Sequence, residues 1–118
     1  MMTEQKTMSI DEILAALEQN LDDRKKSTAE ASYVASLYKK GLNKILEKIG
    51  EEATEVILAA KDAKDDQESR ADLVNESADL LFHTFVALRY LDIPISDVFE
   101  VLGKRLNISG HEEKASRG

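Results

Sequence analysis

Acidic side chains occur in two pairs on segments that otherwise carry a helical pattern of apolar residues. Glu52 and Glu55 are three residues apart, which puts both on one face of a helix, and Glu76 and Asp79 repeat that spacing later in the chain. If the two helices form an antiparallel hairpin, the pairs face each other. At ~5 Å and an effective dielectric of ~20, each pair of like charges costs about 3 kcal/mol. We therefore expect protonation or a bound cation to relieve the repulsion.

A cluster of carboxylates offers only oxygen ligands, which select a hard cation such as Mg²⁺, with Mn²⁺ as a substitute. Because Mg²⁺ shares its coordination with substrate phosphates, the acids indicate an enzyme that hydrolyses a phosphate linkage of a nucleotide. Either pair alone is typical of a solvated helix surface, and only the two together, each beside an apolar stripe, favour a site. A di-iron bundle would need Glu-x-x-His, but the residue three before His83 is Leu80.

Basic side chains near the acids are candidates for binding phosphate. Lys48 lies one turn before Glu52 on the same predicted face, whereas Lys61 falls roughly opposite Glu52 and would serve another surface or a second subunit. His83 lies one turn after Asp79 and could orient a ligand or a water. Taken singly, each lysine is typical of a solvated surface, and the histidine is typical of a hydrogen-bonded, partly buried side chain.

The elements that must position these residues are two long helices. Apolar residues recur at helical spacing over residues 42–64 and again over 70–91, with a polar turn at 65–69 between them. An antiparallel hairpin of these two helices brings the acid pairs together.

Shorter helices are expected on either side of the hairpin. Ser9, with Glu12 three residues later, predicts a capping box at the start of a helix that ends near Leu21. Residues 27–41 allow either a short helix capped by Ser27 or Thr28, or a loop with one helical segment. Pro94 ends the second long helix, and Ser96 is predicted to cap a final helix.

The composition supports an all-α fold. The 118 residues suit one domain, 1–118, with 1–8 and 108–118 expected as flexible tails. Aromatic residues are only 5% of the chain, and it has five glycines and one proline, so we predict an aliphatic core and few tight turns. The expected architecture is a bundle of four to five helices, completed by homodimerisation through the long pair.

Charge and cysteine content exclude several classes of function. The net charge of −7 argues against a general nucleic-acid binder, which would present a basic face. Cysteine is absent, which removes disulfides, thiolate zinc sites and cysteine nucleophiles. No apolar run is long enough to span a membrane, and the first nine residues lack the apolar segment of a signal peptide. We therefore expect a cytoplasmic protein without a membrane partner.

Two motifs carry a resemblance to a known family. The run K-x-G-E-E-A-x-E covers residues 48–55, and E-S-A-D-L-L-F-H covers 76–83; upstream lie S-Y-x-x-x-L from Ser32 and G-L-x-K-I-L from Gly41. Together they resemble phosphoribosyl-ATP pyrophosphohydrolase of histidine biosynthesis over about residues 30–105. The wider all-α nucleotide pyrophosphohydrolase superfamily, which is MazG-like, shares only the E-x-x-E and E-x-x-D skeleton.

The resemblance implies a MazG-like helical homodimer that hydrolyses phosphoribosyl-ATP to phosphoribosyl-AMP and pyrophosphate. It implies a cyclohydrolase on a separate chain, since this chain has no cysteine for that domain's zinc. The roles it implies are Mg²⁺ ligands at Glu52, Glu55, Glu76 and Asp79, an accessory acid at Glu51, and phosphate contacts at Lys48 and Lys61. For the mechanism, Glu51 or Glu55 is the expected proton acceptor.

Two other functions remain open at this stage. One is a MazG-like housecleaning enzyme that hydrolyses canonical or damaged (d)NTPs, which the segment from Ser32 to Gly41 disfavours. The other is a non-catalytic helical dimerisation module whose acids form only a solvated face.

Overall fold

The computed structural model describes residues 7–107, and within that range the chain is all-helical, with no strand. The predicted all-α class is therefore confirmed. The expected tails lie almost wholly outside the described residues. The elements in chain order are α1 (Ile10–Asp23), the 3₁₀ turn η1 (Arg24–Lys26), α2 (Tyr33–Lys40), α3 (Leu42–Asp62), α4 (Gln67–Tyr90) and α5 (Ser96–Leu106).

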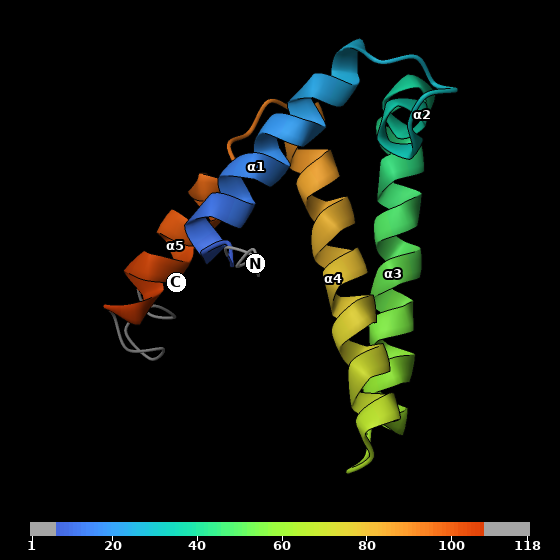
Figure 1. Cartoon of the computed structure of the whole chain (residues 1–118), viewed down its shortest axis with the longest axis vertical. Helices are drawn as coiled ribbons and strands as arrows, with labels where there is room; N and C mark the ends of the chain where they lie inside the picture. Colours follow the sequence, from blue (N-terminus) through green and yellow to red (C-terminus); the bar gives the residue numbers. More distant parts are fainter. Residues whose placement is uncertain (1–6, 108–118) are drawn as a thin grey trace, which may run out of the picture.

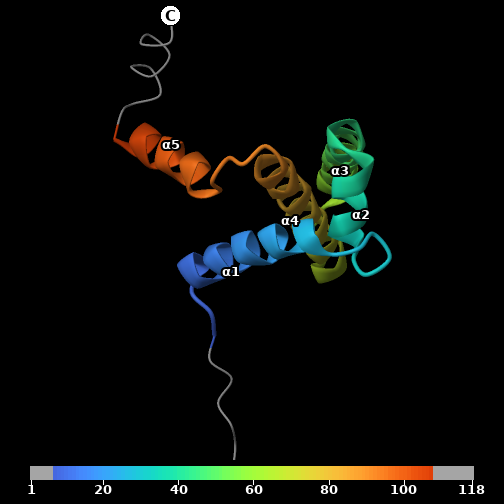
Figure 2. The same cartoon turned by 90° about the horizontal axis from the view of Figure 1, so that it is seen from above.

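The dominant feature is the antiparallel hairpin of α3 and α4, which lie side by side along their lengths (Figures 1 and 2). The predicted pair of long helices is confirmed. The second begins slightly earlier than expected, because the Asp66 carboxylate accepts hydrogen bonds from the Ser69 amide at 2.8 Å and the Ser69 hydroxyl at 3.0 Å. At the other end of α3, Gly41 has φ +97°, a conformation that favours glycine and lets α2 turn directly into α3.

The buried core is concentrated at the upper end of the hairpin in Figure 1, where α1, α2, α3 and α4 meet. Its fully buried side chains are Leu21, Leu37, Ile45, Val86 and Ile95. The lower part of the hairpin, with its turn, extends beyond the other helices, while α1 and α5 lie on the α4 side in both views (Figures 1 and 2). Glu52 and Asp79 lie near the middle of α3 and α4, so the acid pairs lie toward the base of this projecting arm of the hairpin and not inside the core.

The shorter elements confirm some predicted boundaries and correct others. The capping box of Ser9 and Glu12 is present, with both reciprocal hydrogen bonds. Of the two alternatives for residues 27–41, the structure has the loop with one helical segment, α2, whose N-cap Ser32 accepts from the Ala35 amide at 2.9 Å through its hydroxyl. The other alternative, a short helix capped by Ser27 or Thr28, was wrong. Ser96 likewise does not cap α5.

Ser96 does not cap α5 because of the conformation of Ile95. This residue is fully buried and already has helical dihedrals, so it occupies the cap position and makes Ser96 the first helical residue. Within residues 7–107, no helix is long and apolar enough to cross a membrane.

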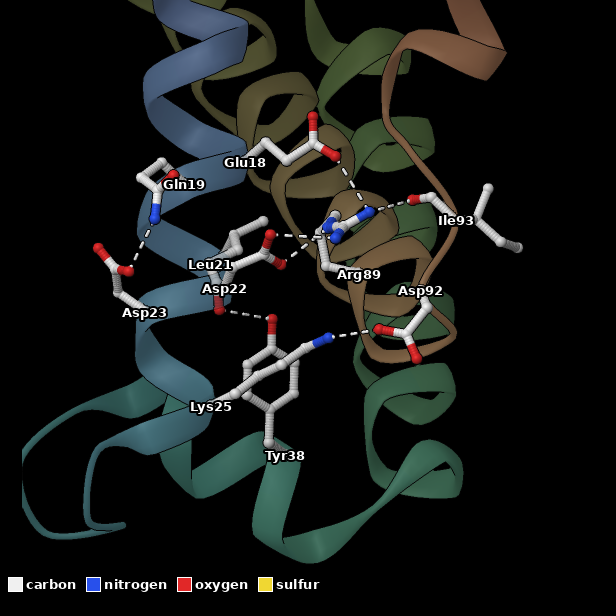
Figure 3. Close-up of polar contacts among 10 residues, drawn as sticks. All are labelled: Glu18, Gln19, Leu21, Asp22, Asp23, Lys25, Tyr38, Arg89, Asp92 and Ile93. Carbon is white, nitrogen blue, oxygen red and sulfur yellow. Dashed lines mark hydrogen bonds and ion pairs between the residues drawn. The ribbon is translucent and has the colours of Figure 1, made fainter.

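Arg89 joins α4 to α1 and to the loop before α5 (Figure 3). Its guanidinium donates two hydrogen bonds to the Asp22 carboxylate, at 2.9 and 3.0 Å, and forms an ion pair with Glu18 at 3.0 Å. It also donates to the carbonyl oxygen of Ile93 at 2.9 Å. Its side chain is only 12% exposed, so these contacts are shielded from water.

We predict that Arg89→Met lowers the free energy of unfolding by about 2 kcal/mol, because it leaves Asp22 and Glu18 without their shared partner. Denaturant unfolding would measure the loss. The matched control is Lys25→Met, which breaks the ion pair to Asp92 at 2.8 Å, whose acid is 81% exposed; a smaller loss is expected there. Equal losses in the two variants would contradict a special role for Arg89.

Candidate active site on the helical hairpin

Three carboxylates from two helices converge near the middle of the hairpin. Glu52 on α3 and Glu76 and Asp79 on α4 each place an oxygen within 4.8 Å of the others. Glu52 and Glu76 are half-buried, and Asp79 is exposed. The antiparallel packing of α3 on α4 brings them together, since the pairs are far apart in sequence. The arrangement of these three residues is thus the one predicted, while their role as metal ligands stays a prediction.

Glu55, the fourth predicted ligand, lies beside this group rather than in it. Its side chain is exposed and borders a shallow hollow of about 410 Å³ between α3 and α4. The residues that line the hollow are Glu55, Leu58, Ala59, Asp62, Ser69, Asp72 and Glu76. Glu76 belongs to both the hollow and the three-carboxylate group, so the two form one continuous acidic surface.

The pKa of Glu76 shows the effect of burial and of the negative charges around it. Partial burial raises the pKa of its carboxyl above the ordinary value of 4.5, and the charges of Glu55, Asp79 and Glu52 raise it further. Ionising Glu76 in the folded chain therefore costs free energy, because the new charge is repelled by the neighbouring carboxylates. A cation among these carboxylates would reverse the sign of that interaction.

Lys48 and Glu51 form an ion pair at the edge of the group. The Lys48 ammonium donates to a Glu51 oxygen at 3.0 Å. This hydrogen bond raises the pKa of Lys48 and lowers the pKa of Glu51. A carboxylate with a lowered pKa is a weaker base, so of the two predicted proton acceptors the pairing disfavours Glu51 and leaves Glu55.

Lys61 lies away from the carboxylate group of its own chain. It is exposed next to the end of α3, nine residues after Glu52. Nine residues correspond to a rotation of about half a turn from the Glu52 face and to about 14 Å along the axis. This geometry places Lys61 away from Glu52 within one chain, and its predicted phosphate contact, on another surface or in a second subunit, stays a prediction.

His83 lies behind Asp79 and is not open to solvent. Its side chain is 6% exposed, with Nδ1 2.8 Å from the carbonyl oxygen of Asp79 and Nε2 2.8 Å from the hydroxyl of Tyr33. Both ring nitrogens are therefore engaged within the chain, and neither is free to make the predicted contact with a ligand. Tyr33 was not among the predicted site residues, although the S-Y motif that contains it marked the family resemblance.

Comparison with known protein families gives one match over most of the chain. A sequence model for the family described as "Phosphoribosyl-ATP pyrophosphohydrolase" matches residues 14–106. That range contains all the acids, lysines and the histidine of the candidate site.

Similar curated proteins carry closely related names. A protein of Hydrogenovibrio crunogenus named phosphoribosyl-ATP pyrophosphatase is 53% identical over 106 residues, which are 90% of this chain and 93% of that protein. Proteins of the same name from Geobacter sulfurreducens and Vesicomyosocius okutanii are 52% and 47% identical over 91% and 92% of this chain, and over 94% and 98% of their own lengths.

We predict that Glu76→Gln raises the melting temperature of the metal-free protein at pH 8. A raised pKa means that the folded state holds the proton more tightly than the unfolded chain. The stability contributed by the protonated group is therefore lost as the pH rises above 4.5 through the raised pKa of Glu76. Glutamine cannot ionise, so it avoids this loss.

Thermal melts in EDTA at several pH values would test this. The difference between variant and wild type should shrink as the pH falls and the wild-type carboxyl becomes protonated. Glu100→Gln, on the exposed surface of α5, is the control and should show no such gain. A variant that melts with the wild type at pH 8 would show that the acids do not repel one another appreciably.

Proposed function

Because the chain belongs to the phosphoribosyl-ATP pyrophosphohydrolase family, we propose that it hydrolyses phosphoribosyl-ATP to phosphoribosyl-AMP and pyrophosphate, as the second step of histidine biosynthesis. The chain is a hydrolase of this family. The observation that carries the proposal is the convergence of Glu52, Glu76 and Asp79, which come from the two motifs that resemble the family. The next step of the pathway would then require a cyclohydrolase on another chain.

The same carboxylates are proposed to hold Mg²⁺, with Mn²⁺ as a substitute. The donor set fits, since Glu52, Glu76 and Asp79 offer only oxygen ligands within 4.8 Å of one another, and Glu55 lies beside them. When bound, Mg²⁺ would neutralise charge on the triphosphate and lower the pKa of a coordinated water.

The side chains around the cluster have distinct proposed roles. Lys48 would keep its ion pair with Glu51 and use another of its three N–H donors to contact substrate phosphate, and Lys61 would contact phosphate from a second subunit. Glu55, exposed beside the cluster, would accept the proton of the attacking water. The water oxygen forms the new bond to one of the two phosphorus atoms of the anhydride between the α and β phosphates. The bond from that phosphorus to the bridging oxygen breaks, and the group on the other side leaves with the electron pair, which gives phosphoribosyl-AMP and pyrophosphate.

A homodimer is part of the proposal, because each long helix carries an exposed apolar stripe. On α4, Val74 and Leu81 are 68% and 55% exposed and lie seven residues apart, on one face. On α3, Leu46 and Ile57 are 48% and 60% exposed, and their spacing of eleven residues again places them on one face. Monomeric proteins rarely expose such stripes, and a second hairpin packed against the first would cover them in a four-helix arrangement.

We predict that Glu52→Gln and Asp79→Asn each lower the turnover of phosphoribosyl-ATP by at least ~100-fold, since the ligand set is worth several kcal/mol of transition-state stabilisation. Pyrophosphate release with and without Mg²⁺ measures this, with ATP and dCTP as parallel substrates. Glu100→Gln is the control and should keep the wild-type rate.

Each outcome of this assay separates the candidate functions. Near-normal rates in both variants would refute the assigned site. Release from ATP or dCTP instead of phosphoribosyl-ATP would favour the housecleaning function. No release from any substrate by the folded protein would favour the non-catalytic module.

We also predict that the wild type elutes as a dimer at micromolar concentration and that Leu81→Glu shifts it toward the monomer. The added carboxylate would place an unpaired charge in an apolar contact. Size-exclusion chromatography with light scattering measures the mass, and Asn20→Glu on α1, where the residue is exposed, provides a charge-matched control. A wild type that is monomeric at this concentration would refute the proposed assembly.

A further inference from the structure

Tyr33 is an exposed aromatic side chain that is nevertheless held in place. It is the first residue of α2 and is 51% exposed, and its hydroxyl lies 2.8 Å from Nε2 of His83. Its backbone is fixed as well, because the preceding Ser32 caps the helix through its hydroxyl. An exposed tyrosine would ordinarily sample several rotamers, whereas this one is tied at both ends.

The direction of the hydrogen bond from Tyr33 follows from the other nitrogen of His83. Nδ1 lies 2.8 Å from the carbonyl oxygen of Asp79, and a carbonyl oxygen can only accept, so Nδ1 carries a proton and donates it. In the neutral imidazole, Nε2 is then the acceptor, and the Tyr33 hydroxyl is the donor. The single proton of this hydroxyl is thus committed to His83.

His83 is fixed by its surroundings and bridges Asp79 to Tyr33. Tyr33 and Phe82 both pack against its ring in edge-to-face geometry, with centroids 5.7 and 5.4 Å away. Its backbone partner is the carbonyl of Asp79, one of the three converging acids. His83 therefore sets where the Tyr33 ring stands relative to the acidic group.

The ring of Tyr33 stands at the edge of the candidate site. Burial raises the pKa of its hydroxyl, the charge of Lys48 opposes that shift, and the charges of Glu52 and Glu51 add to it. Two hydrogen bonds of 2.8 Å, through the ring of His83, connect the Tyr33 hydroxyl to the backbone of Asp79, one of the three converging acids. The exposed part of the ring thus adjoins the region where the nucleotide would bind.

We propose that Tyr33 is a substrate-contacting residue whose exposed ring face packs on the planar purine base of the nucleotide, and that His83 is a positioning residue that holds this ring. The inference rests on the proposed function and deepens it. A phosphate would require a donor, but the Tyr33 proton is already committed, and Lys48 is available for that role. The aromatic face is the part of Tyr33 left to bind, and a base is the part of a nucleotide that stacks on it.

Steady-state kinetics with phosphoribosyl-ATP test the contact with substrate. Tyr33→Leu removes the aromatic face and should raise KM by ~10- to 100-fold, the usual effect of losing one stacking partner, with a smaller change in kcat. Tyr33→Phe keeps the ring but loses its anchor, so a rise of only a few-fold is expected. Tyr90→Leu is the matched control, because Tyr90 is 36% exposed and packs on Tyr38 at the C-terminal end of α4, about two turns beyond His83; its KM should not change.

Variants of His83 test the positioning role separately. His83→Leu should raise KM about as much as Tyr33→Phe does. His83→Gln, whose side-chain amide can still accept from the Tyr33 hydroxyl, should restore most of the loss. If His83→Leu fails to fold by circular dichroism, the comparison of His83→Gln with Tyr33→Phe decides, since an intact anchor predicts a lower KM for His83→Gln.

Binding measured by NMR separates this inference from the proposed function, because it does not need turnover. AMP should shift the Tyr33 ring resonances by ring-current effects, whereas inorganic pyrophosphate should not. If AMP leaves these resonances unmoved and Tyr33→Leu has the wild-type KM, the inference is overturned while the hydrolase assignment stands. If phosphoribosyl-ATP is not hydrolysed, the proposed function fails, and the AMP titration still decides whether Tyr33 contacts a purine.

Discussion

The packing of α3 against α4 is the constraint on which the rest of the structure depends. It forces Glu52, Glu76 and Asp79 within 4.8 Å of one another although their charges repel. Apolar burial around Ile45 and Val86, each about two turns from the acids along the same helices, opposes that repulsion. The core thus holds the two helices together and thereby keeps the acids close to one another.

The basic groups are arranged so that little positive charge reaches the acids in the free chain. Lys48 is paired with Glu51, and Arg89 is committed to Asp22 and Glu18 far up the hairpin. Partial burial and the charges of Glu55, Asp79 and Glu52 raise the pKa of Glu76. The proposed divalent ion would supply positive charge at this position.

The apolar residues of the hairpin are distributed unevenly, and this supports the proposed homodimer. The core gathers where four helices meet, while Val74, Leu81 and Ile57 remain largely exposed on the arm. One chain has only two helices along the arm, which is too few to cover both faces of a layer. A proposed second copy would bury these side chains.

The sequence by itself determined the helices, the acid pairs and the family. Local signals sufficed for these, because hydrophobic period, the capping box at Ser9 and residue spacing all act within a few turns. The cap of α2 at Ser32 and the cap position of α5 at Ile95 were missed, since neighbouring serines offer the same capping hydroxyl and the buried Ile95 already has helical dihedrals. Only the tertiary structure showed that Glu51 is paired, that Glu55 lies beside the other acids, and that His83 is turned toward Tyr33. Those facts depend on how side chains from α2, α3 and α4 meet in space, and spacing along the chain carries no information about contacts between residues fifty positions apart.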